Sequence, residues 1–549
     1  MTARTVLMLV AVAGTVALAP LQQRRCLHLL QLEHYENARL LLWLRRRGEL
    51  TVVRIAAPRL LLLAATVVFC WSDTVSPAAE LAAVAGLTAL NSWEFSTHLR
   101  RKEIKPLVYT KRAKLILSAA LTPEVLALCV AVALSATAGG RLAATVCLCL
   151  LSAVATIPAA LTVAASNAVK PWQRHVNRRF AKQAVQTLSE VSPRVIGVTG
   201  SYGKTTAKVC IGAVLSVQQP TLITPASFNS YLGVVRTINE LLRPKHRNFV
   251  VEMGMYRAGD IAELCDLTHP QIGVITAIGP AHLERMGSIE AIQQAKGELA
   301  HALSADGQLI VNGDDPRCLA IAAGVTVSTT AYGITNHDAD VRAENLRLAD
   351  GRTSFELVIG EQRITVRAGL LGDHNVSNLL AAAAVGHIAG MTISQIKRGL
   401  EAVRPPEHRL QPISNPGSGV IVIDDAYNSN PAGAAAALRV LAEHPAARRI
   451  LVTPGMVELG ALEDAENERF GALAAAACDH VILVGPRRTG PIRRGLVSSG
   501  FDPSAVTTVA DINGATKALA ELTRAGDVIL FENDLPDLYT ETASRSANS

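Results

Sequence analysis

Residues 194–206 read Arg-Val-Ile-Gly-Val-Thr-Gly-Ser-Tyr-Gly-Lys-Thr-Thr, and this stretch decides the fold of the chain around it. Its first half is rich in β-branched residues and predicts a buried strand. The residues from Lys204 to Val217 contain no proline and only Gly212 as a helix breaker, so they predict a helix. A glycine-rich turn between a strand and a helix points backbone N–H groups at an anion. The pattern therefore predicts a phosphate-binding loop in an α/β domain.

The loop residues expected to surround nucleotide phosphates are Gly200, Ser201, Tyr202, Gly203, Lys204, Thr205 and Thr206. Lys204 would neutralise the β- and γ-phosphate oxygens, and the Thr205 hydroxyl would hold magnesium. The match to the general pattern G-x-x-x-x-G-K-[ST] is approximate, because Val198 occupies its first position and Gly197 is displaced by one residue. For the loop taken alone, an ordinary tight turn is the alternative.

Composition indicates several domains and a membrane association. The chain has 549 residues, of which 49% are hydrophobic, and a length of this kind suggests about three or four domains. Nine cysteines without a C-x-x-C pair argue against a disulfide scaffold or a zinc site. The formal charge of +7 comes with basic stretches at 24–59 and 100–114 that border apolar segments. We therefore expect anionic lipid headgroups as partners, and no nucleic acid.

The N-terminal third predicts a helical membrane domain of about five transmembrane segments. The apolar runs lie near 5–21, 60–71, 77–93, 115–138 and 142–166. A spanning helix needs about 20 apolar residues, which the last two runs fit best. The first run is either a signal peptide or, as we prefer, a retained anchor. The second and third runs either both cross or form a re-entrant hairpin, because 60–71 is short and 77–93 contains Glu80. The positive-inside rule then places the C-terminal region in the cytoplasm.

A series of short motifs follows the phosphate loop in a fixed order. They are Ser227-Phe-Asn-Ser-Tyr-Leu-Gly233, Val251-Glu252-Met-Gly254, Thr276-Ala-Ile-Gly279-Pro-Ala-His282-Leu-Glu284, Ala295-Lys296-Gly-Glu298, Asn312-Gly-Asp314-Asp315, Gly372-Asp-His374-Asn375-Val-Ser-Asn378, Arg404-Pro-Pro-Glu-His-Arg409, Asp424-Asp425-Ala-Tyr427-Asn428 and Gly455-Met-Val-Glu458. With G-x-x-G-K-T-T, this order and spacing resemble the Mur ligase family, of the MurF type, over about residues 190–535. MurF-type enzymes join D-alanyl-D-alanine to a UDP-muramyl tripeptide.

The resemblance implies a catalytic centre with ATP and two magnesium ions. It makes Thr205, Glu252, His282 and Lys296 metal ligands and Lys204, His282 and Lys296 catalytic, and it implies a carbamylated Lys296. Read from the residues alone, Glu252 closes an apolar strand, where carboxylates can meet magnesium. The alternatives are an exposed strand-end charge for Glu252, a structural or substrate-contacting role for His282, and a surface charge for Lys296.

The same resemblance implies an adenosine site shared by two domains. Its residues would be His374, Asn375, Asn378, Arg409, Asp424, Tyr427 and Asn428. An asparagine amide would contact adenine, Arg409 would reach ATP phosphate, and Asp424 would bind ribose. From the residues, Asn375 could instead cap the helix predicted from Val376. Asp425 is expected only to orient its loop.

The expected architecture is a helical membrane domain at 1–180, a central ATP-binding Mur-ligase α/β domain at 181–404 and a C-terminal Rossmann-like α/β domain at 405–549. The expected enzyme is an ADP-forming, ATP-dependent ligase that joins a carboxylate to an amino-acid or peptide amine through an acyl phosphate. It would sit in a bacterial-type cell membrane as a multi-pass protein and act on a cell-wall or related peptide precursor. The alternatives are a MurF-like ligase of a specialised peptide pathway, and a membrane binding or regulatory protein with a degenerate ligase domain.

Two departures from the family leave the substrates, the protein partners and the role of the membrane segments open. Membrane segments occupy the place of the small soluble domain that grips the UDP-sugar. In addition, the basic Lys-Gly-Ser-Arg loop of the family is replaced by the acidic sequence Glu532-Asn533-Asp534. An acidic loop would repel an anionic group, and it suits an amine-bearing or differently charged acceptor.

Overall fold

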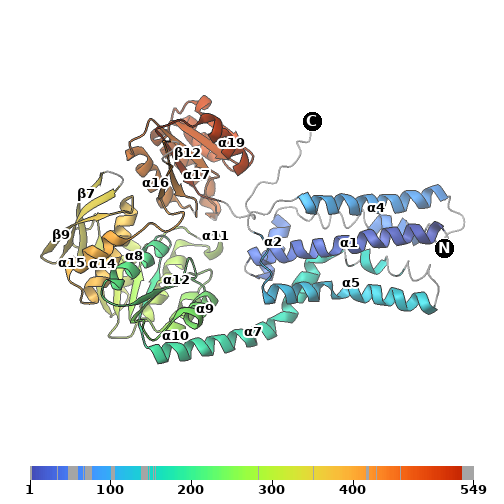
Figure 1. The fold of residues 1–549 in the computed structure, drawn as a ribbon, viewed down its shortest axis with the longest axis horizontal. Coiled ribbons are helices and arrows are strands. Elements are labelled where there is room, and N and C mark those ends of the chain that lie inside the picture. The colour runs from blue at the N-terminus through green and yellow to red at the C-terminus, as the bar shows by residue number, and fades with distance from the viewer. Residues whose placement is uncertain are drawn as a thin grey trace. The chain divides into compact units, whose positions relative to one another are not determined.

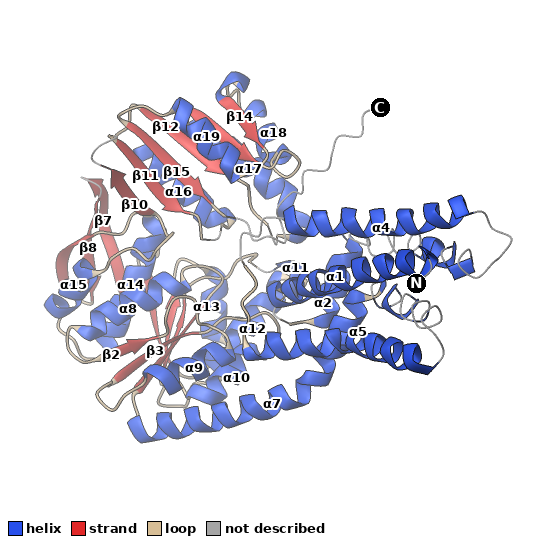
Figure 2. Cartoon of the chain, turned by 45° about the vertical axis from the view of Figure 1, so that its right-hand side comes forward, coloured by secondary structure: helices blue, strands red, loops and turns tan. Residues whose placement is uncertain are grey.

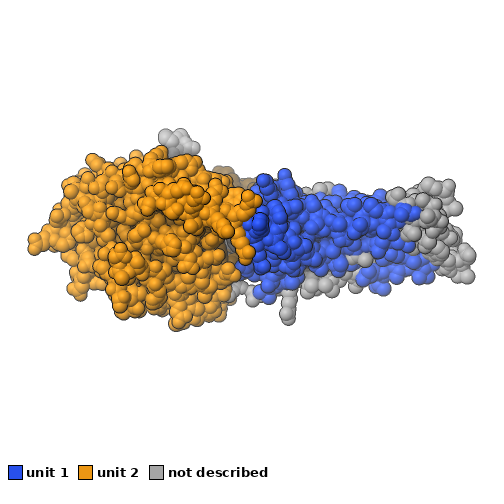
Figure 3. All heavy atoms as spheres, turned by 90° about the horizontal axis from the view of Figure 1, so that it is seen from below, with its two compact units in different colours: residues 1–177, 536–538 blue, residues 178–535, 539–549 orange. Residues whose placement is uncertain are grey.

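The structure is a computed structural model of the chain. It describes residues 3–33, 35–46, 60–65, 67–68, 77–100, 106–137, 146, 149–152, 154, 156–281, 283–349, 352–415, 419–427, 429–457 and 459–534. The chain divides into two compact units, shown in different colours in Figure 3. Unit 1 comprises residues 1–177 with 536–538, and unit 2 comprises residues 178–535 with 539–549.

Unit 1 is helical in nearly all of its described residues. Its helices are α1 (Ala3–Leu32), α2 (Asn37–Arg46), α4 (Pro77–Arg100), α5 (Lys111–Thr137) and the first part of α7 (Pro158–Val191), as Figure 1 shows. Helix α1 packs against both α4 and α5. The apolar contacts include Leu27 of α1, Ile116 of α5 and Ala165 of α7. Ile116 and Ala165 belong to the predicted apolar runs 115–138 and 142–166, whereas Leu27 lies beyond the run 5–21.

One helical segment of the described residues, Lys111–Val130 of α5, is long and apolar enough to cross a membrane. Helix α4 is continuous through the predicted run 77–93. Parts of the predicted runs 60–71 and 142–166 lie outside the described residues. The arrangement with about five spans stays a prediction.

A nine-stranded sheet forms the first part of unit 2, in the order β2-β3-β1-β4-β5-β6-β7-β8-β9. Its strands are β1 (Arg194–Thr199), β2 (Thr221–Ile223), β3 (Asn248–Glu252), β4 (Ile272–Ile275), β5 (Gln308–Asn312), β6 (Ser328–Gly333), β7 (Val341–Ala349), β8 (Arg352–Ile359) and β9 (Gln362–Ala368). The pairs from β2 through β7 are parallel, and β7, β8 and β9 are antiparallel. The predicted strand before the phosphate loop is confirmed as β1, which lies between β3 and β4 inside the parallel part.

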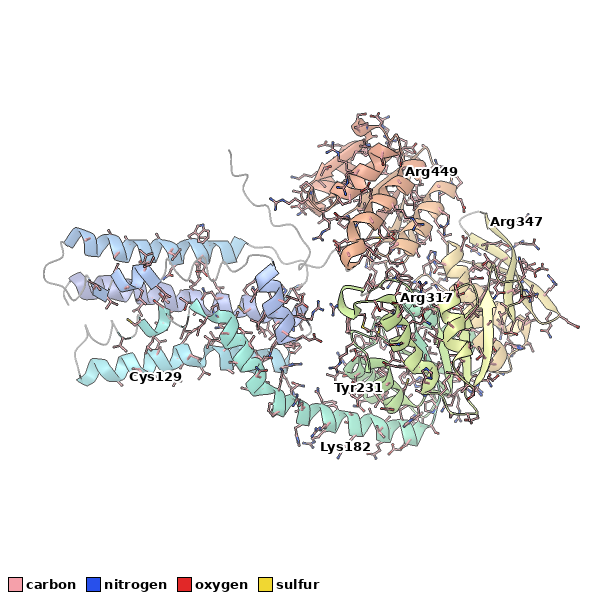
Figure 4. The ribbon with its side chains drawn as sticks, turned by 180° about the vertical axis from the view of Figure 1, so that it is seen from behind. Cys129, Lys182, Tyr231, Arg317, Arg347 and Arg449 are labelled. Atoms are coloured by element: carbon pink, nitrogen blue, oxygen red, sulfur yellow. The ribbon has the colours of Figure 1, made fainter. Side chains whose placement is uncertain are left out.

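Helices cover both faces of this sheet because successive side chains of a strand point to opposite faces. They are α8 (Lys204–Ser216), α9 (Tyr231–Leu241), α10 (Asp260–Thr268), α11 (Leu283–Met286), α12 (Ile289–His301), α13 (Pro316–Ala323), α14 (Asp373–Ile388) and α15 (Ile393–Ala402). Ile196 and Val198 of β1 share a core with α8, α14 and α15, whereas Val195 lies in the core with α9, α10 and α12. The end of α7 joins the second face, where the Asn239 amide donates to the Phe180 carbonyl at 3.0 Å. Figure 4 labels Lys182 on α7 and Tyr231 on α9 on this face.

A six-stranded sheet forms the rest of unit 2, in the order β10-β11-β15-β12-β13-β14 (Figure 2). Its elements are β10 (Gln411–Asn415), β11 (Val420–Asp425), α16 (Pro431–Glu443), β12 (Arg448–Thr453), η1 (Gly460–Leu462), α17 (Glu463–Ala477), β13 (His480–Val484), α18 (Gly490–Ser498), η2 (Pro503–Ala505), β14 (Val506–Val509), α19 (Ile512–Leu522) and β15 (Asp527–Glu532). All pairs are parallel except β10 with β11. Helices α16, α17 and α18 pack on one face and α19 on the other. The prediction of two α/β sheets is therefore confirmed.

Candidate functional site

The phosphate loop joins β1 to α8 through two glycines with positive φ. Gly200 has φ +152°, and Gly203 has φ +78° as the residue before α8. A Cβ atom on Gly200 would collide with the Thr276 hydroxyl, and one on Gly203 would collide with the Asn378 side-chain oxygen. The Thr276 and Asn378 side chains therefore allow only glycine at these two positions, because the loop backbone passes directly against them.

The loop is anchored to the segment after β4. The Ser201 backbone N–H donates to the Ala277 carbonyl at 2.6 Å. The Ser201 hydroxyl donates to the Gly279 carbonyl and accepts from the Gly279 N–H, both at 2.9 Å. The Thr276 hydroxyl donates to the Tyr202 carbonyl. These bonds tie the phosphate loop to the segment that follows β4, which ends at Ile275.

Lys204 lies in the loop at the N-terminus of α8. Its Nζ donates to the Gly200 carbonyl at 2.6 Å and to the Ser201 carbonyl at 3.3 Å. Burial lowers the pKa of Lys204, and the Glu252 carboxylate opposes that shift. A helix N-terminus with an adjoining lysine provides both N–H donors and a positive charge for phosphate.

Glu252 ends β3 and accepts hydrogen bonds from three side chains. The Thr205 hydroxyl and the Lys208 Nζ each lie 3.0 Å from its Oε2, and the Asn229 amide lies 3.0 Å from its Oε1. The Lys208 and Glu252 side chains are each 1% exposed, so they form a buried ion pair. An exposed strand-end charge, the alternative for Glu252, is therefore wrong. The register of β1 between β3 and β4 brings Glu252 beside the loop, because Val198 pairs with Glu252.

The Lys208 contact did not follow from the motif. Its signal was available in the sequence, because Lys208 stands four residues after Lys204 and so lies one helical turn further along the same face of α8.

Lys296 is buried on α12, which begins after the Ser288 cap. The residue is 2% exposed, so the alternative of a surface charge is wrong. Burial lowers the pKa of Lys296 far below its usual range, and the Lys204 charge lowers it further. His282 lies outside the described residues. Within the described residues, no group of three or more His, Cys, Asp or Glu side chains is placed to hold a metal ion.

The predicted adenosine residues of the first domain lie at the start of α14. The Asn375 amide donates to the Leu371 carbonyl at 2.8 Å, and the Asn378 amide donates to the Asn375 side-chain oxygen at 3.2 Å. Asn375 is inside the helix and Gly372 precedes it, so the alternative of Asn375 as the cap is wrong. Burial lowers the pKa of His374 to about 4, so its ring is neutral at pH 7.

Tyr427 of the C-terminal domain bonds to the central domain, and Arg409 packs on the Tyr427 ring. The Arg409 guanidinium lies 4.3 Å from the centroid of the Tyr427 ring, a cation–π contact. The Tyr427 hydroxyl donates to the Ser227 hydroxyl at 2.5 Å. Asp424 is held by His408, whose Nδ1 lies 2.7 Å from Asp424 Oδ2. Asn428 lies outside the described residues.

Asp425 and Glu532 form a second pair of side chains that the sequence did not place together. They occupy paired positions at the ends of the parallel strands β11 and β15. Burial raises the pKa of Asp425 to about 6, and burial together with Asp425 raises the pKa of Glu532 well above its usual range. The signal in the sequence was that two apolar strands each end in a carboxylate.

A cavity of about 600 Å³ collects most of these residues, and its volume is that of a small-molecule site. The predicted residues that line it are Ser201, Tyr202, Gly203, Lys204, Thr205, Thr206, Glu252, His374, Asn375, Asn378, Arg409 and Tyr427. Gly200, Lys296 and Asp424 do not line it, whereas Asp425 and Glu532 do. The side of β11 that faces the cavity therefore presents Asp425, which the sequence assigned only an orienting role.

Comparison with known proteins covers both parts of unit 2. Residues 198–386 match the Mur ligase middle domain, and residues 408–532 match the Mur ligase glutamate ligase domain. The chain is 36% identical over 361 residues to UDP-N-acetylmuramoyl-tripeptide--D-alanyl-D-alanine ligase of Mycobacterium tuberculosis, covering 62% of this chain and 70% of that protein. The enzyme of the same name from Bacillus subtilis is 33% identical, with 63% and 74% covered.

Solved structures agree with the sequence relatives. MurF from Acinetobacter baumannii aligns with a TM-score of 0.58 at 27% identity, covering 65% of this chain and 77% of that one. MurF ligase from Thermotoga maritima in complex with ADP aligns with a TM-score of 0.58 at 25% identity, covering 65% and 80%. Folylpolyglutamate synthase of Mycobacterium tuberculosis shares the fold at 18% identity and a TM-score of 0.51. The chain belongs to the Mur ligase family, as a MurF-type, ATP-dependent and ADP-forming ligase.

Proposed function

We propose that this chain forms an amide bond between a carboxylate and an amine through an acyl phosphate, on a cell-wall or related peptide precursor. The observation that carries this proposal is the cavity itself. Its wall combines Lys204 and Thr205 at the phosphate loop with Arg409 from the C-terminal domain. This arrangement suits a nucleotide whose transferred phosphate is surrounded by positive charge.

In the proposed first step, an oxygen of the substrate carboxylate attacks the γ-phosphorus of ATP, and the bond to ADP breaks. Lys204 and Arg409 stabilise the charge that develops on the phosphoryl oxygens. In the second step, the acceptor amine attacks the acyl carbon, phosphate leaves and the amine loses a proton. Contacts between the domains, such as the Tyr427 to Ser227 bond, help to keep water from the acyl phosphate.

The residues present fit the magnesium ion that this chemistry uses. The Thr205 hydroxyl and the Glu252 carboxylate supply adjacent oxygen donors, 3.0 Å apart. Magnesium is commonly held by one or two carboxylates together with substrate phosphates and waters. Bound there, it would supply electrostatic stabilisation of the phosphates. Lys296 fits carbamylation, because burial favours the neutral amine that reacts with carbon dioxide.

We also propose that unit 1 anchors the ligase in the membrane with its catalytic domains in the cytoplasm. The support is the apolar segment Lys111–Val130, which begins with the basic residues Lys111, Arg112 and Lys114. Basic residues at one end of a span favour a cytoplasmic location for that end. Neither of the two Mur ligase matches extends to residues 1–197. Retention of the full chain in carbonate-washed membranes tests this part, and release into the soluble fraction would contradict it.

The ligase proposal is tested by incubating the purified full chain with ATP, magnesium and candidate carboxylates, among them UDP-muramyl tripeptide. Hydroxylamine should trap a hydroxamate, with ADP and phosphate as the other products. The Lys204→Ala variant should give about 10³-fold less of each product. Formation of AMP and pyrophosphate would contradict the acyl phosphate route. The absence of turnover in both proteins would favour the second candidate, a degenerate binding or regulatory domain.

A further inference from the structure

The end of α1 is fixed to the beginning of α5 at the basic end of the apolar segment Lys111–Val130. The Gln31 side chain of α1 donates to the Val108 carbonyl and accepts from the Val108 N–H, both at 2.9 Å. The Arg112 guanidinium of α5 lies 4.0 Å from the centroid of the Tyr35 ring, a cation–π contact. These contacts place the turn after α1 beside the first turn of α5.

Helices α2 and α7 reach the same end of unit 1. The Asn37 amide at the start of α2 donates to the Asn167 side-chain oxygen of α7 at 2.9 Å. Val169 of α7 packs in one apolar cluster with Tyr35 and with Ala113 of α5. We use the name end layer for residues 31–46, 107–114 and 167–174, all of which belong to unit 1.

The end layer exposes large apolar side chains. Leu41 and Leu42 of α2 are 49% and 46% exposed, although Leu40 beside them is buried. Tyr109 and Trp172 are each 46% exposed. Exposed apolar side chains that gather in one region mark an interaction surface. Tyrosine and tryptophan are in addition enriched at the level where a bilayer meets water.

The same layer carries most of the net charge of the chain. It has eight Lys or Arg residues and two Glu residues, a formal charge of +6, whereas the whole chain has +7. Lys111, Lys114 and Arg174 are exposed, and none of them forms an ion pair among the described residues. Of the two acidic residues, Glu33 is already bonded to Arg39. The layer therefore presents uncompensated positive charge.

Anionic phospholipid is the partner that fits both features. The apolar stretch of α5 continues from Leu115, directly after the basic residues, so the layer lies at the boundary of the candidate span. In a bilayer with acidic lipids, negative headgroups lie at that boundary, beside the acyl chains. A neutral lipid would leave the cations without a counter-charge, and a soluble acidic protein would leave the leucines without an apolar environment.

We propose that the end layer binds anionic phospholipid headgroups, so that the anchor of this ligase selects the acidic lipids of its membrane. The inference rests on the proposed membrane anchoring, whose lipid class it names. It adds a lipid-binding site outside the two Mur ligase matches, which begin at residue 198.

The test reconstitutes the full chain in phosphatidylcholine nanodiscs that contain a trace of spin-labelled phosphatidylglycerol or, in parallel, of spin-labelled phosphatidylcholine. Electron spin resonance measures how much of each label is immobilised at the protein. The wild-type chain should hold the anionic label at least about threefold more than the neutral one, a preference of the size that several screened cations give. The preference should decrease as salt is added. The triple variant Lys111→Gln, Lys114→Gln and Arg174→Gln should lose most of it.

A second triple variant is the matched control. Lys245→Gln, Arg493→Gln and Lys517→Gln remove the same charge from exposed residues of unit 2. This control should keep the wild-type preference. Because every substituted side chain is exposed, both triple variants should retain the far-UV circular dichroism of the wild-type chain.

Equal immobilisation of the two labels by the wild-type chain would overturn the inference. So would an unchanged preference in the site variant, or an equal loss in the site variant and the control. Displacement of the anionic label by soluble polyglutamate would assign the layer to an acidic protein and would also contradict the inference. Failure of the membrane anchoring looks different, because the chain would then not enter nanodiscs of any composition.

Discussion

The two ends of the cavity treat buried charge in opposite ways. At the phosphate-loop end, Glu252 is bonded to Lys208, Thr205 and Asn229, so its charge is fully compensated. At the end of the six-stranded sheet, Asp425 and Glu532 lie side by side; burial raises the pKa of both carboxyl groups, and the Asp425 charge raises that of Glu532 further. Compensated charges hold the loop in a fixed geometry, whereas two neighbouring buried carboxyl groups without a cation favour sharing a proton.

The largest effect is expected from removing the charge that the loop presents to phosphate. The Lys204→Ala variant should lower kcat/KM for ATP by about 10³-fold, since one positioned donor of this kind contributes 10²–10³-fold or more. Steady-state ADP formation measures it. A loss below tenfold would show that Lys204 has a structural role and does not stabilise the transferred phosphate.

The next effect concerns the compensated pair. Lys208→Met leaves Glu252 buried without its cation and should destabilise the chain by about 3–5 kcal/mol. Urea unfolding followed by near-UV circular dichroism measures the change. The double variant Lys208→Met with Glu252→Gln should recover part of the loss. Equal destabilisation in the single and double variants would mean that the pair is not coupled.

Removing a charge from the pair Asp425 and Glu532 should stabilise the chain, whereas removing Lys208 should destabilise it. The folded pKa values of Asp425 and Glu532 are raised, so this part of the stability is present at low pH and is lost as pH rises through those values. Glu532→Gln removes the repulsion. It should change stability little at pH 5 and increase it by about 1–2 kcal/mol at pH 8. Unfolding at both pH values measures this, and a destabilisation at pH 8 would show that the charge is compensated after all.

The smallest effect should come from the link between the two domains. Tyr427→Phe removes the hydroxyl that donates to Ser227 but keeps the ring under Arg409. A single hydrogen bond contributes about 0.5–1.5 kcal/mol, so KM for ATP should rise about twofold to tenfold. Ser227→Ala should have the same effect and should not add to it. Additive effects would show that the two hydroxyl groups act separately.

Sequence reasoning worked best where local pattern and backbone constraint coincide. The strand, the glycine turn and the helix around Lys204 were all confirmed. Each of them is determined by local features that the sequence shows, namely the pattern of apolar residues and the positions of the glycines. It could not decide between Asp424 and Asp425 as the cavity-lining carboxylate. Adjacent strand residues point to opposite faces, and the choice depends on which face the other sheet elements cover.

Contacts between distant segments were also beyond the sequence. The bond between Lys208 and Glu252 spans 44 positions, and Glu532 lies 107 positions after Asp425 in the chain. Strand order creates these contacts, because β15 inserts between β11 and β12 although it is last in the chain. The pattern of one strand gives no information about that insertion.

The contact between Gly203 and Asn378 has a consequence for how this enzyme can change over generations. The side-chain oxygen of Asn378 occupies the space that a Cβ of Gly203 would need, and Asn378 is bonded to Asn375. Residues expected to recognise the base therefore also fix the shape of the turn that holds phosphate. A mutation that alters base preference would disturb the turn at the same time. Drift toward another nucleotide is thus restrained by the geometry of the phosphate loop.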